Sequence, residues 1–231
     1  MTGPIALVGS GEYLPVLEPL ERRLLAGRPP RFVQLATAAA PEGQASLARW
    51  HELGRSAAER LGVQQVVVPV VDRVSADDEE LAALVDGAGL VYLSGGNPPF
   101  LAATLRGTAV WRAIERAWQG GAALVGCSAG AIALTDHVPD LRHPLTPAEP
   151  GLAVVPGLRV LPHFDRFAGR LPDGLLTRLV DTPPGVTVVG VDEDTALVGG
   201  PGEWEVVGRQ SVWVLTGDGR TEHPAGSRLT A

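Results

Sequence analysis

The sequence contains one cysteine and one methionine, and it has no long uninterrupted run of apolar residues. A single cysteine permits neither an internal disulfide nor a metal site built from several thiolates, which is typical of a cytoplasmic protein. Without an apolar run of roughly 20 residues, no transmembrane helix is expected. No basic segment precedes the first apolar residues, so we interpret the N-terminus as a strand and not as a secretory signal.

Basic residues are also few, because 19 arginine and lysine residues face 26 aspartates and glutamates, for a formal net charge of −7. With this balance and no basic cluster, nucleic-acid binding is not expected. Apolar residues make up 45% of the 231 positions, enough for one substantial core. No linker or repeat divides the chain, so we predict a single domain over residues 1–231. The five histidines show no ligand-like spacing with carboxylates, so neither a metal nor another cofactor is expected.

Short apolar segments alternate with amphipathic ones along the first half of the chain. The expected strands are residues 5–8, 31–36, 63–71, 90–93 and 122–125, and the expected helices are residues 44–62, 76–86 and 108–119. A long loop then covers residues 136–156, followed by a strand at 159–161, a short helix at 173–180 and several strands after residue 186. We therefore predict an α/β fold of three layers. Its mostly parallel central sheet carries helices on both faces and antiparallel strands at the C-terminal edge.

The segment from Gly126 to Gly130 reads GCSAG and joins an apolar strand to an alanine-rich helix. A G-x-S-x-G sequence at such a junction indicates a nucleophile elbow, because small flanking residues allow a sharp and strained turn. The hydroxyl of Ser128 is then a candidate nucleophile, and the N–H of Ala129 faces the charge that develops during attack. The alternative is an ordinary tight turn that closes a βα unit.

A serine nucleophile needs a base, and His163 is the best candidate among the five histidines. It follows directly on an apolar strand, where side chains of an α/β sheet converge on a site, and it lies 35 residues after Ser128. The alternative role of His163 is a hydrogen bond at the end of a strand. The other histidines lie in a helix, in the long loop or in the tail: His51, His137, His143 and His223.

A glycine-rich loop, Gly9-Ser10-Gly11-Glu12, follows the first expected strand. Such a loop can bind phosphate through its backbone N–H groups. Here it lacks both the third glycine of a dinucleotide site and the Lys-Ser/Thr pair of a nucleotide-binding loop. The signal is weak, and a loop packed near the rim of the active site is the alternative.

Four segments together carry a family resemblance: LVYLSGGN, GCSAGA, LPHFD and GVDEDTALV. In this order and spacing, the chain resembles the peptidase E and cyanophycinase family of serine peptidases, which is related in fold to class I glutamine amidotransferases. The resemblance implies a Ser-His-acid triad with Ser128 as nucleophile and His163 as base. It also implies an oxyanion hole formed by the N–H of Ala129 and an N–H of the glycine loop, Gly96 or its neighbour Gly95.

The resemblance leaves the acid of the triad open. Asp140 lies 23 residues before His163, close to the separation usual in the family, and is the first choice. Glu149 and Asp136 are the alternatives. The family favours aspartyl substrates, whose carboxylate requires a cationic partner.

Arg166 and Arg170 are therefore candidates for substrate binding, together with Gly95 and Asn97 of the glycine loop. Each of these arginines is alternatively a surface residue.

The resemblance thus implies a dipeptidase or exopeptidase that cleaves short peptides, with a preference for aspartyl residues. The alternatives are a cyanophycinase-like β-aspartyl peptidase, a glutaminase-like amidotransferase and a non-catalytic binding module of the same fold. Glutaminase chemistry needs a thiolate, whereas Cys127 stands one position before the centre of the elbow. The expected partner is a short peptide substrate and not a nucleic acid or a membrane, and the resemblance also suggests a homodimer.

Overall fold

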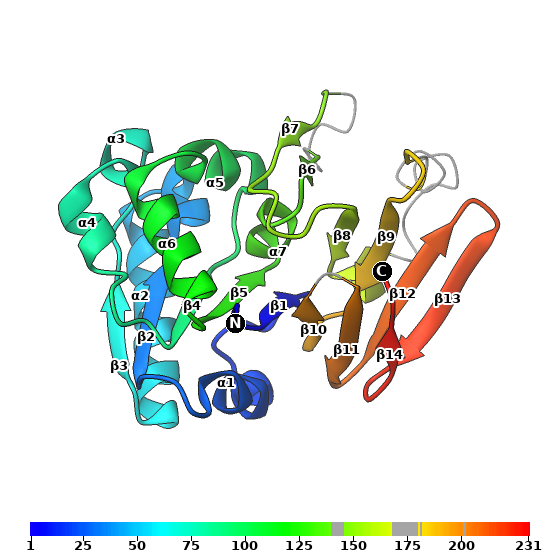
Figure 1. Cartoon of the computed structure of the whole chain (residues 1–231), viewed down its shortest axis with the longest axis horizontal. Helices are drawn as coiled ribbons and strands as arrows, with labels where there is room; N and C mark the ends of the chain where they lie inside the picture. The colour runs from blue at the N-terminus through cyan, green and yellow to red at the C-terminus, as the bar shows by residue number, and fades with distance from the viewer. Residues whose placement is uncertain (140–145, 168–179, 181, 201) are drawn as a thin grey trace.

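The computed structural model describes residues 1–139, 146–167, 180, 182–200 and 202–231. Its larger sheet has eight strands in the order β14-β11-β10-β1-β5-β4-β2-β3 (Figure 1). These strands are β1 (Ile5–Val8), β2 (Arg31–Leu35), β3 (Gln64–Val67), β4 (Leu90–Leu93), β5 (Ala123–Cys127), β10 (Thr195–Gly200), β11 (Glu203–Gly208) and β14 (Arg228–Leu229). Strands β1 to β5 pair in parallel, and β10, β11 and β14 continue the sheet in antiparallel fashion beyond β1. The predicted mostly parallel sheet with an antiparallel C-terminal edge is therefore confirmed.

Helices cover both faces of this sheet, because successive residues of each strand point to opposite sides. In β1, Ile5 and Leu7 pack into the core beneath α4 to α7, whereas Ala6 and Val8 pack into the core beneath α1 and α2. The helices are α1 (Glu18–Leu25), α2 (Gln44–Leu61), α3 (Arg73–Ala76), α4 (Glu79–Ala83), α5 (Pro98–Leu105), α6 (Ala109–Gln119), α7 (Ala129–Ala133) and α8 (Phe164–Phe167). Two 3₁₀ turns, Pro15–Leu17 and Thr37–Glu42, precede α1 and α2.

Two of the helical segments differ from the sequence prediction. The helix expected over residues 76–86 is instead the pair α3 and α4, because two aspartates start two separate helices. Asp72 accepts the N–H of Ser75 in a capping box, and Asp78 accepts the first N–H groups of α4. Helix α5 replaces the end of an expected loop, since the side chain of Asn97 caps it and proline follows at its first position.

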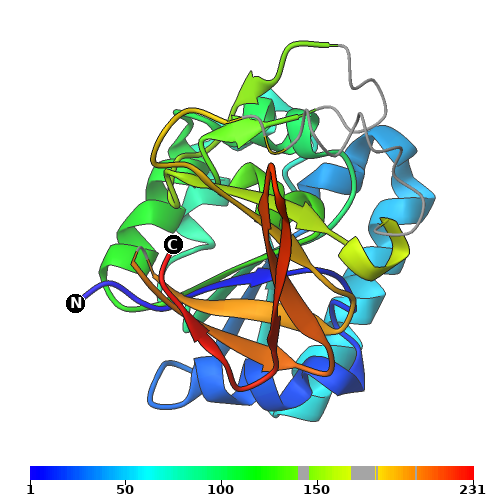
Figure 2. The same ribbon diagram turned by 90° about the vertical axis from the view of Figure 1, so that its right-hand side faces the viewer.

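A second sheet, with strand order β13-β12-β9-β8, was not predicted. It contains β8 (Leu158–Pro162), β9 (Thr187–Val191), β12 (Ser211–Thr216) and β13 (Gly219–Pro224). Figure 2 shows these strands and the antiparallel edge of the larger sheet facing the viewer. The tail strands thus divide between two sheets, because a three-residue corner ending at Asp194, with φ of 55°, turns the chain from β9 into β10.

The expected loop at residues 136–156 contains a small hairpin of β6 (His137–Val138) and β7 (Glu149–Pro150). Most of the helix expected at 173–180 lies outside the described residues. Among the residues that are described, no helix is both long and apolar enough to cross a membrane. The same residues contain no group of three or more histidine, cysteine or acidic side chains placed to hold a metal ion.

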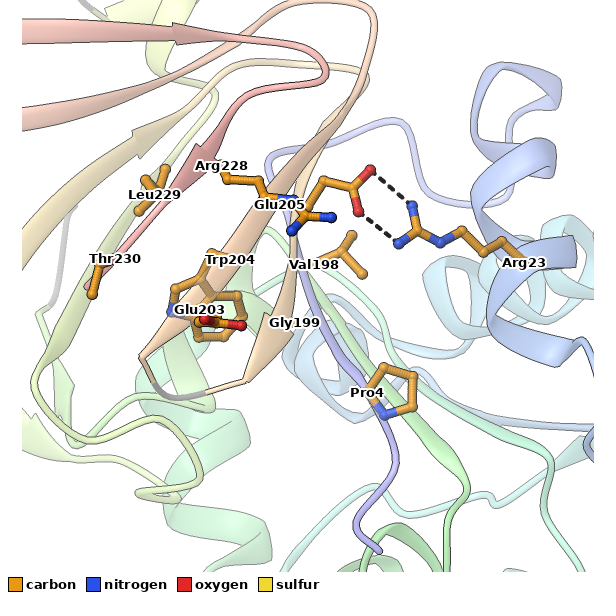
Figure 3. A pocket seen from close by; sticks show the side chains of 10 residues that line it. All are labelled: Pro4, Arg23, Val198, Gly199, Glu203, Trp204, Glu205, Arg228, Leu229 and Thr230. Atoms are coloured by element: carbon orange, nitrogen blue, oxygen red, sulfur yellow. Dashed lines mark hydrogen bonds and ion pairs between the residues drawn. The ribbon is translucent and has the colours of Figure 1, made fainter.

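Helix α1 is joined to the antiparallel edge of the large sheet by an ion pair. The guanidinium of Arg23 donates two hydrogen bonds to Glu205, of 3.0 and 2.7 Å (Figure 3). This pair lines a cavity of about 410 Å³ that also includes Pro4 and Trp204. Because Pro4 precedes β1, the cavity lies at the amino ends of the parallel strands, away from the site described below.

Helix α1 carries a buried glutamate, Glu21. Glu21 is 2% exposed, and neither of its side-chain oxygens has a hydrogen-bond partner in the structure. Burial raises the pKa of Glu21 to about 7, and the charge of Arg60 only partly opposes this effect. The side chain is therefore protonated in the folded protein at mildly acidic pH, where the unfolded chain would already have lost the proton.

We expect Glu21→Gln to remove a pH-dependent loss of stability. As pH rises from 4.5 to about 7, the unfolded wild-type chain ionises Glu21 while the folded chain keeps it neutral, so the free energy of unfolding falls. The fall amounts to about 3 kcal/mol over the whole window and is absent from the amide variant, which cannot ionise. Urea unfolding of both proteins at pH 5 and pH 8 measures the difference. Identical pH dependence in the two proteins would contradict the assignment.

Candidate active site

The expected nucleophile elbow is present between β5 and α7. Ser128 has φ of 50° and ψ of −108°, a conformation that is costly for a residue with a side chain, and its N–H donates to Val8 O at 2.9 Å. The turn requires glycine on both sides of the serine. A Cβ on Gly126 would lie 2.5 Å from the backbone of Gly130, and one on Gly130 would lie 2.3 Å from Leu93 O. The strand, turn and helix therefore form the sharp junction that the sequence pattern predicts.

Three side chains at this junction form a continuous hydrogen-bonded chain. Ser128 Oγ lies 3.1 Å from His163 Nε2, and His163 Nδ1 lies 3.0 Å from Glu193 Oε1. A carboxylate at Nδ1 assigns the imidazole proton to that nitrogen, which leaves Nε2 to accept the hydroxyl proton of Ser128. The arrangement has the connectivity of a serine-histidine-acid triad.

The base and the carboxylate are brought together by two neighbouring strands. Strands β8 and β9 pair in parallel with Pro162 opposite Val191, so the residues that follow both strands lie side by side. His163 is placed with φ of 53°, in the left-handed region, directly after β8. The next side chain, Phe164, packs so closely on β9 that a Cβ on Gly190 would lie 2.3 Å from its ring.

Glu193 is held in place from three directions. Besides its bond with His163, its Oε2 accepts Arg166 Nε at 3.0 Å, and its backbone N–H donates to Asp165 Oδ1 at 2.9 Å. The hydrogen bond from His163, followed by the Arg166 guanidinium, lowers the pKa of Glu193 below its ordinary value. The carboxylate is therefore ionised and fixed against the imidazole near neutral pH.

Sequence reasoning did not single out Glu193 as the acid. Asp140 and Arg170 lie outside the described residues, and Asp136 and Glu149 are exposed. The rule that selected His163, a polar side chain directly after an apolar strand, points to Asp192 and not to Glu193, because β9 ends at Val191. Glu193 stands in the motif GVDEDTALV, but the sequence does not reveal that its strand lies beside β8.

The glycine loop between β4 and α5 lies against the nucleophile. A Cβ on Gly95 would lie in van der Waals contact with Ser128, 3.8 Å from its Oγ, and only 2.7 Å from Glu12 Oε1. Gly96 has φ of 141°, and a Cβ on it would lie 2.3 Å from Ala38 O. Asn97, expected near the substrate, uses its side-chain oxygen to accept the N–H of Phe100 at the start of α5.

A buried carboxylate lies behind the glycine loop and the elbow. Glu12 Oε1 accepts Gly95 N–H at 3.1 Å, and Glu12 Oε2 accepts the thiol of Cys127 at 3.0 Å. Burial, and after it the charge of Glu12, raises the pKa of the Cys127 thiol well above its usual range. A protonated, fully buried thiol is a poor nucleophile, which disfavours glutaminase chemistry at this site. The carboxylate also disfavours phosphate binding by the first glycine-rich loop.

The geometry agrees with comparisons with known proteins. The model of peptidase family S51 matches residues 8–206. The chain belongs to peptidase family S51. The chain is 30% identical over 178 residues to the cyanophycinase of Synechococcus elongatus, covering 72% of this chain and 52% of the relative. It is 28% identical over 167 residues to the cyanophycinase of Trichormus variabilis, covering 68% and 55% respectively. The chain thus spans about half the length of the curated relatives it matches.

Two solved structures resemble the chain over nearly its whole length. A peptidase from an acI-B1 actinobacterium is 40% identical, with a TM-score of 0.91 over 100% of this chain and 98% of the other. A putative peptidase E protein from Listeria monocytogenes has a TM-score of 0.59 and 17% identity, over 98% of this chain and 100% of the other. The second likeness shows the fold alone. The family and its peptidase E-like fold are those that the sequence motifs predicted.

Proposed function

We propose that the chain hydrolyses peptide bonds in short peptides through an acyl-enzyme on Ser128, with His163 as base and Glu193 as the acid of the triad. The observation that carries this proposal is the pair of hydrogen bonds, of 3.1 and 3.0 Å, that link the hydroxyl to the imidazole and the imidazole to the carboxylate. Each group lies within the reach that proton transfer requires.

In the first half of the reaction, His163 Nε2 takes the proton of Ser128 while Oγ attacks the carbonyl carbon of the scissile bond. Glu193 holds the ring in the required tautomer and stabilises the imidazolium that forms. When the tetrahedral intermediate collapses, the C–N bond breaks and the imidazolium gives its proton to the leaving amine. The acyl group remains on Ser128 as an ester.

In the second half, water takes the place of the amine. His163 removes a proton from this water, which attacks the ester carbonyl, and the proton then returns to Ser128 Oγ as the acid product leaves. The same three residues therefore serve both halves of the reaction. Both halves use the two hydrogen bonds that are already present in the structure.

Two backbone N–H groups are candidates for stabilising the oxyanion of each intermediate. One belongs to Ala129, the residue after the nucleophile, and the other to Gly96. The N–H of Gly95 is already donated to Glu12, whereas no hydrogen bond of Gly96 N–H is formed within the described part of the chain. We therefore assign the donor of the glycine loop to Gly96.

For the substrate, we propose a preference for a peptide with an aspartyl carboxylate near the scissile bond. Arg166 is 69% exposed and is fixed through Nε to Glu193, beside the base. Its terminal nitrogens form no hydrogen bond with the described residues, so they are placed to pair with a substrate carboxylate. A second candidate, cleavage of a β-aspartyl polymer, is favoured by the relatives named cyanophycinase.

A hydrolysis screen tests this proposal. We expect the purified chain to cleave aspartyl or β-aspartyl dipeptides at least about tenfold faster, in kcat/KM, than matched glycyl dipeptides, because one good charged contact is worth roughly that factor. Cyanophycin serves as the polymeric substrate, and ammonia release from glutamine serves as the comparison for amidotransferase chemistry. Failure to cleave any peptide, together with an inert Ser128 towards a fluorophosphonate, would favour a non-catalytic binding module.

A further inference from the structure

Two consecutive residues after β1 hold two consecutive residues of the glycine loop. Glu12 accepts the N–H of Gly95 at 3.1 Å, and the hydroxyl of Tyr13 lies 2.6 Å from Ser94 Oγ. Both side chains are buried, with Glu12 8% exposed and Tyr13 1% exposed. A loop that would otherwise be anchored only at its ends is thereby fixed in its middle.

The carboxylate of Glu12 also reaches the elbow. Its second oxygen accepts the thiol of Cys127 at 3.0 Å, and Cys127 is the residue directly before Ser128. One side chain therefore bridges the two segments that carry the proposed oxyanion donors, the glycine loop with Gly96 and the elbow with Ala129. A buried carboxylate in such contacts has few alternative orientations, since both of its oxygens are engaged.

The contacts of Glu12 with the glycine loop and the elbow determine which N–H group of the loop is left to face the oxyanion. With its N–H donated to Glu12, Gly95 cannot contribute that group to an oxyanion, and the Gly96–Asn97 peptide is fixed by the hydrogen bond from Asn97 N to Ala38 O at 2.8 Å. We propose that Glu12 is a positioning residue for the oxyanion hole. By holding Gly95 against the elbow, it sets the separation and direction of the Gly96 and Ala129 donors. This inference rests on the proposed serine peptidase function.

The expected loss of rate without Glu12 depends on how strictly the N–H donors must be placed around the oxyanion. Donors contribute when they point at the developing charge at hydrogen-bond distance, and loss of one donor typically lowers kcat by about 10²- to 10³-fold. Release of the loop misplaces one donor without removing the nucleophile or the base. Binding of substrate in its ground state is therefore affected much less than turnover.

The test compares Glu12→Met with Glu12→Gln, using a fluorophosphonate that labels serine nucleophiles. Both variants remove the charge and keep the length of the side chain, but only glutamine retains an oxygen that can accept Gly95 N–H. We expect the limiting labelling rate per titrated site to fall about 10²-fold in E12M and no more than about tenfold in E12Q. The half-saturating probe concentration is expected to stay within about threefold of wild type in both.

Glu21→Gln is the matched control, since it changes the other buried glutamate, a residue of α1 that makes no hydrogen bond to the glycine loop or the elbow. We expect it to be labelled at the wild-type rate. A purely structural role of Glu12 would lower the fraction of protein that reacts while leaving the rate per reacting site unchanged, and this result overturns the proposal. Equal rates in E12M and E12Q also overturn it.

Folding of each variant is followed by thermal unfolding. Should E12M lack a cooperative transition, Glu12→Asp takes its place, because its carboxylate is one methylene short of Gly95. Its labelling rate is then expected to fall about tenfold below that of E12Q, and a rate equal to E12Q overturns the proposal. Absence of labelling in the wild type refutes the proposed function and this role together, whereas normal labelling of the wild type and of E12M refutes the role of Glu12 alone.

Discussion

Replacement of Ser128 by alanine is expected to lower kcat/KM for peptide hydrolysis by about 10⁴- to 10⁶-fold. Removal of the nucleophile prevents the acyl-enzyme, and only the residual effect of binding and of the oxyanion donors remains. The His163–Glu193 hydrogen bond does not depend on the hydroxyl and is kept in the variant. The measurement is the rate of dipeptide hydrolysis at saturating and at low substrate, together with loss of fluorophosphonate labelling.

A matched serine variant separates this effect from general damage. Ser46 lies at the start of α2, where its hydroxyl donates to Glu42 at 2.6 Å on the exposed face. Ser46→Ala is expected to retain wild-type activity and labelling. If S128A hydrolysed dipeptides at a rate within tenfold of wild type while remaining folded, a serine mechanism at this elbow could not be maintained.

The second large effect is expected from Glu193→Gln, which should lower kcat by about 10⁴-fold with little change in KM. The amide keeps the shape of the carboxylate, but it neither enforces the Nδ1–H tautomer nor stabilises the imidazolium. Steady-state kinetics with the best dipeptide substrate measure both constants.

The lowered pKa of Glu193 also makes the stability of the fold depend on pH. Its ionised form stabilises the fold above the ordinary pKa of a glutamate, and this contribution is lost as the pH falls through the lowered value.

Variants of the other candidate acids from the sequence are the controls for Glu193→Gln. Asp136→Asn and Glu149→Gln change exposed residues, and both variants are expected to stay close to the wild-type rate. Asp140→Asn belongs in the same series, because that residue stays a prediction from the sequence. If kcat stayed near the wild-type value in E193Q and fell strongly in D140N, Asp140 and not Glu193 would be the acid of the triad.

The elbow could be predicted because all of its determinants are local. Gly126 and Gly130 are needed for contacts within the turn or with the adjacent strand, and the sequence displays them beside the serine. The position of His163 was predicted from a similarly local rule, the end of an apolar strand. The central sheet followed from its continuous apolar strands, which can be recognised without knowledge of their partners.

Glu193 and Glu12 could not be predicted in this way, because their roles depend on which strands are neighbours. The carboxylate of Glu193 meets His163 only because β9 pairs in parallel with β8. These strands belong to the four-stranded sheet, and the sequence pattern of the tail does not show that this sheet is distinct from the eight-stranded one. Glu12 lies 83 positions from Gly95 in the chain, and nothing in either segment shows that they touch. Long-range pairing, and not local propensity, determines these two contacts.

Ser128, the proposed nucleophile, follows a strand of the eight-stranded sheet, whereas His163 and Glu193 follow strands of the four-stranded sheet. The proposed proton transfer therefore passes from one sheet to the other through one hydrogen bond of 3.1 Å. A relative shift of the two sheets by about 1 Å would lower turnover by about 10²-fold while every strand keeps its partners. Under the proposed mechanism, we therefore expect peptide hydrolysis to be lost at a lower denaturant concentration than that at which the two sheets unfold.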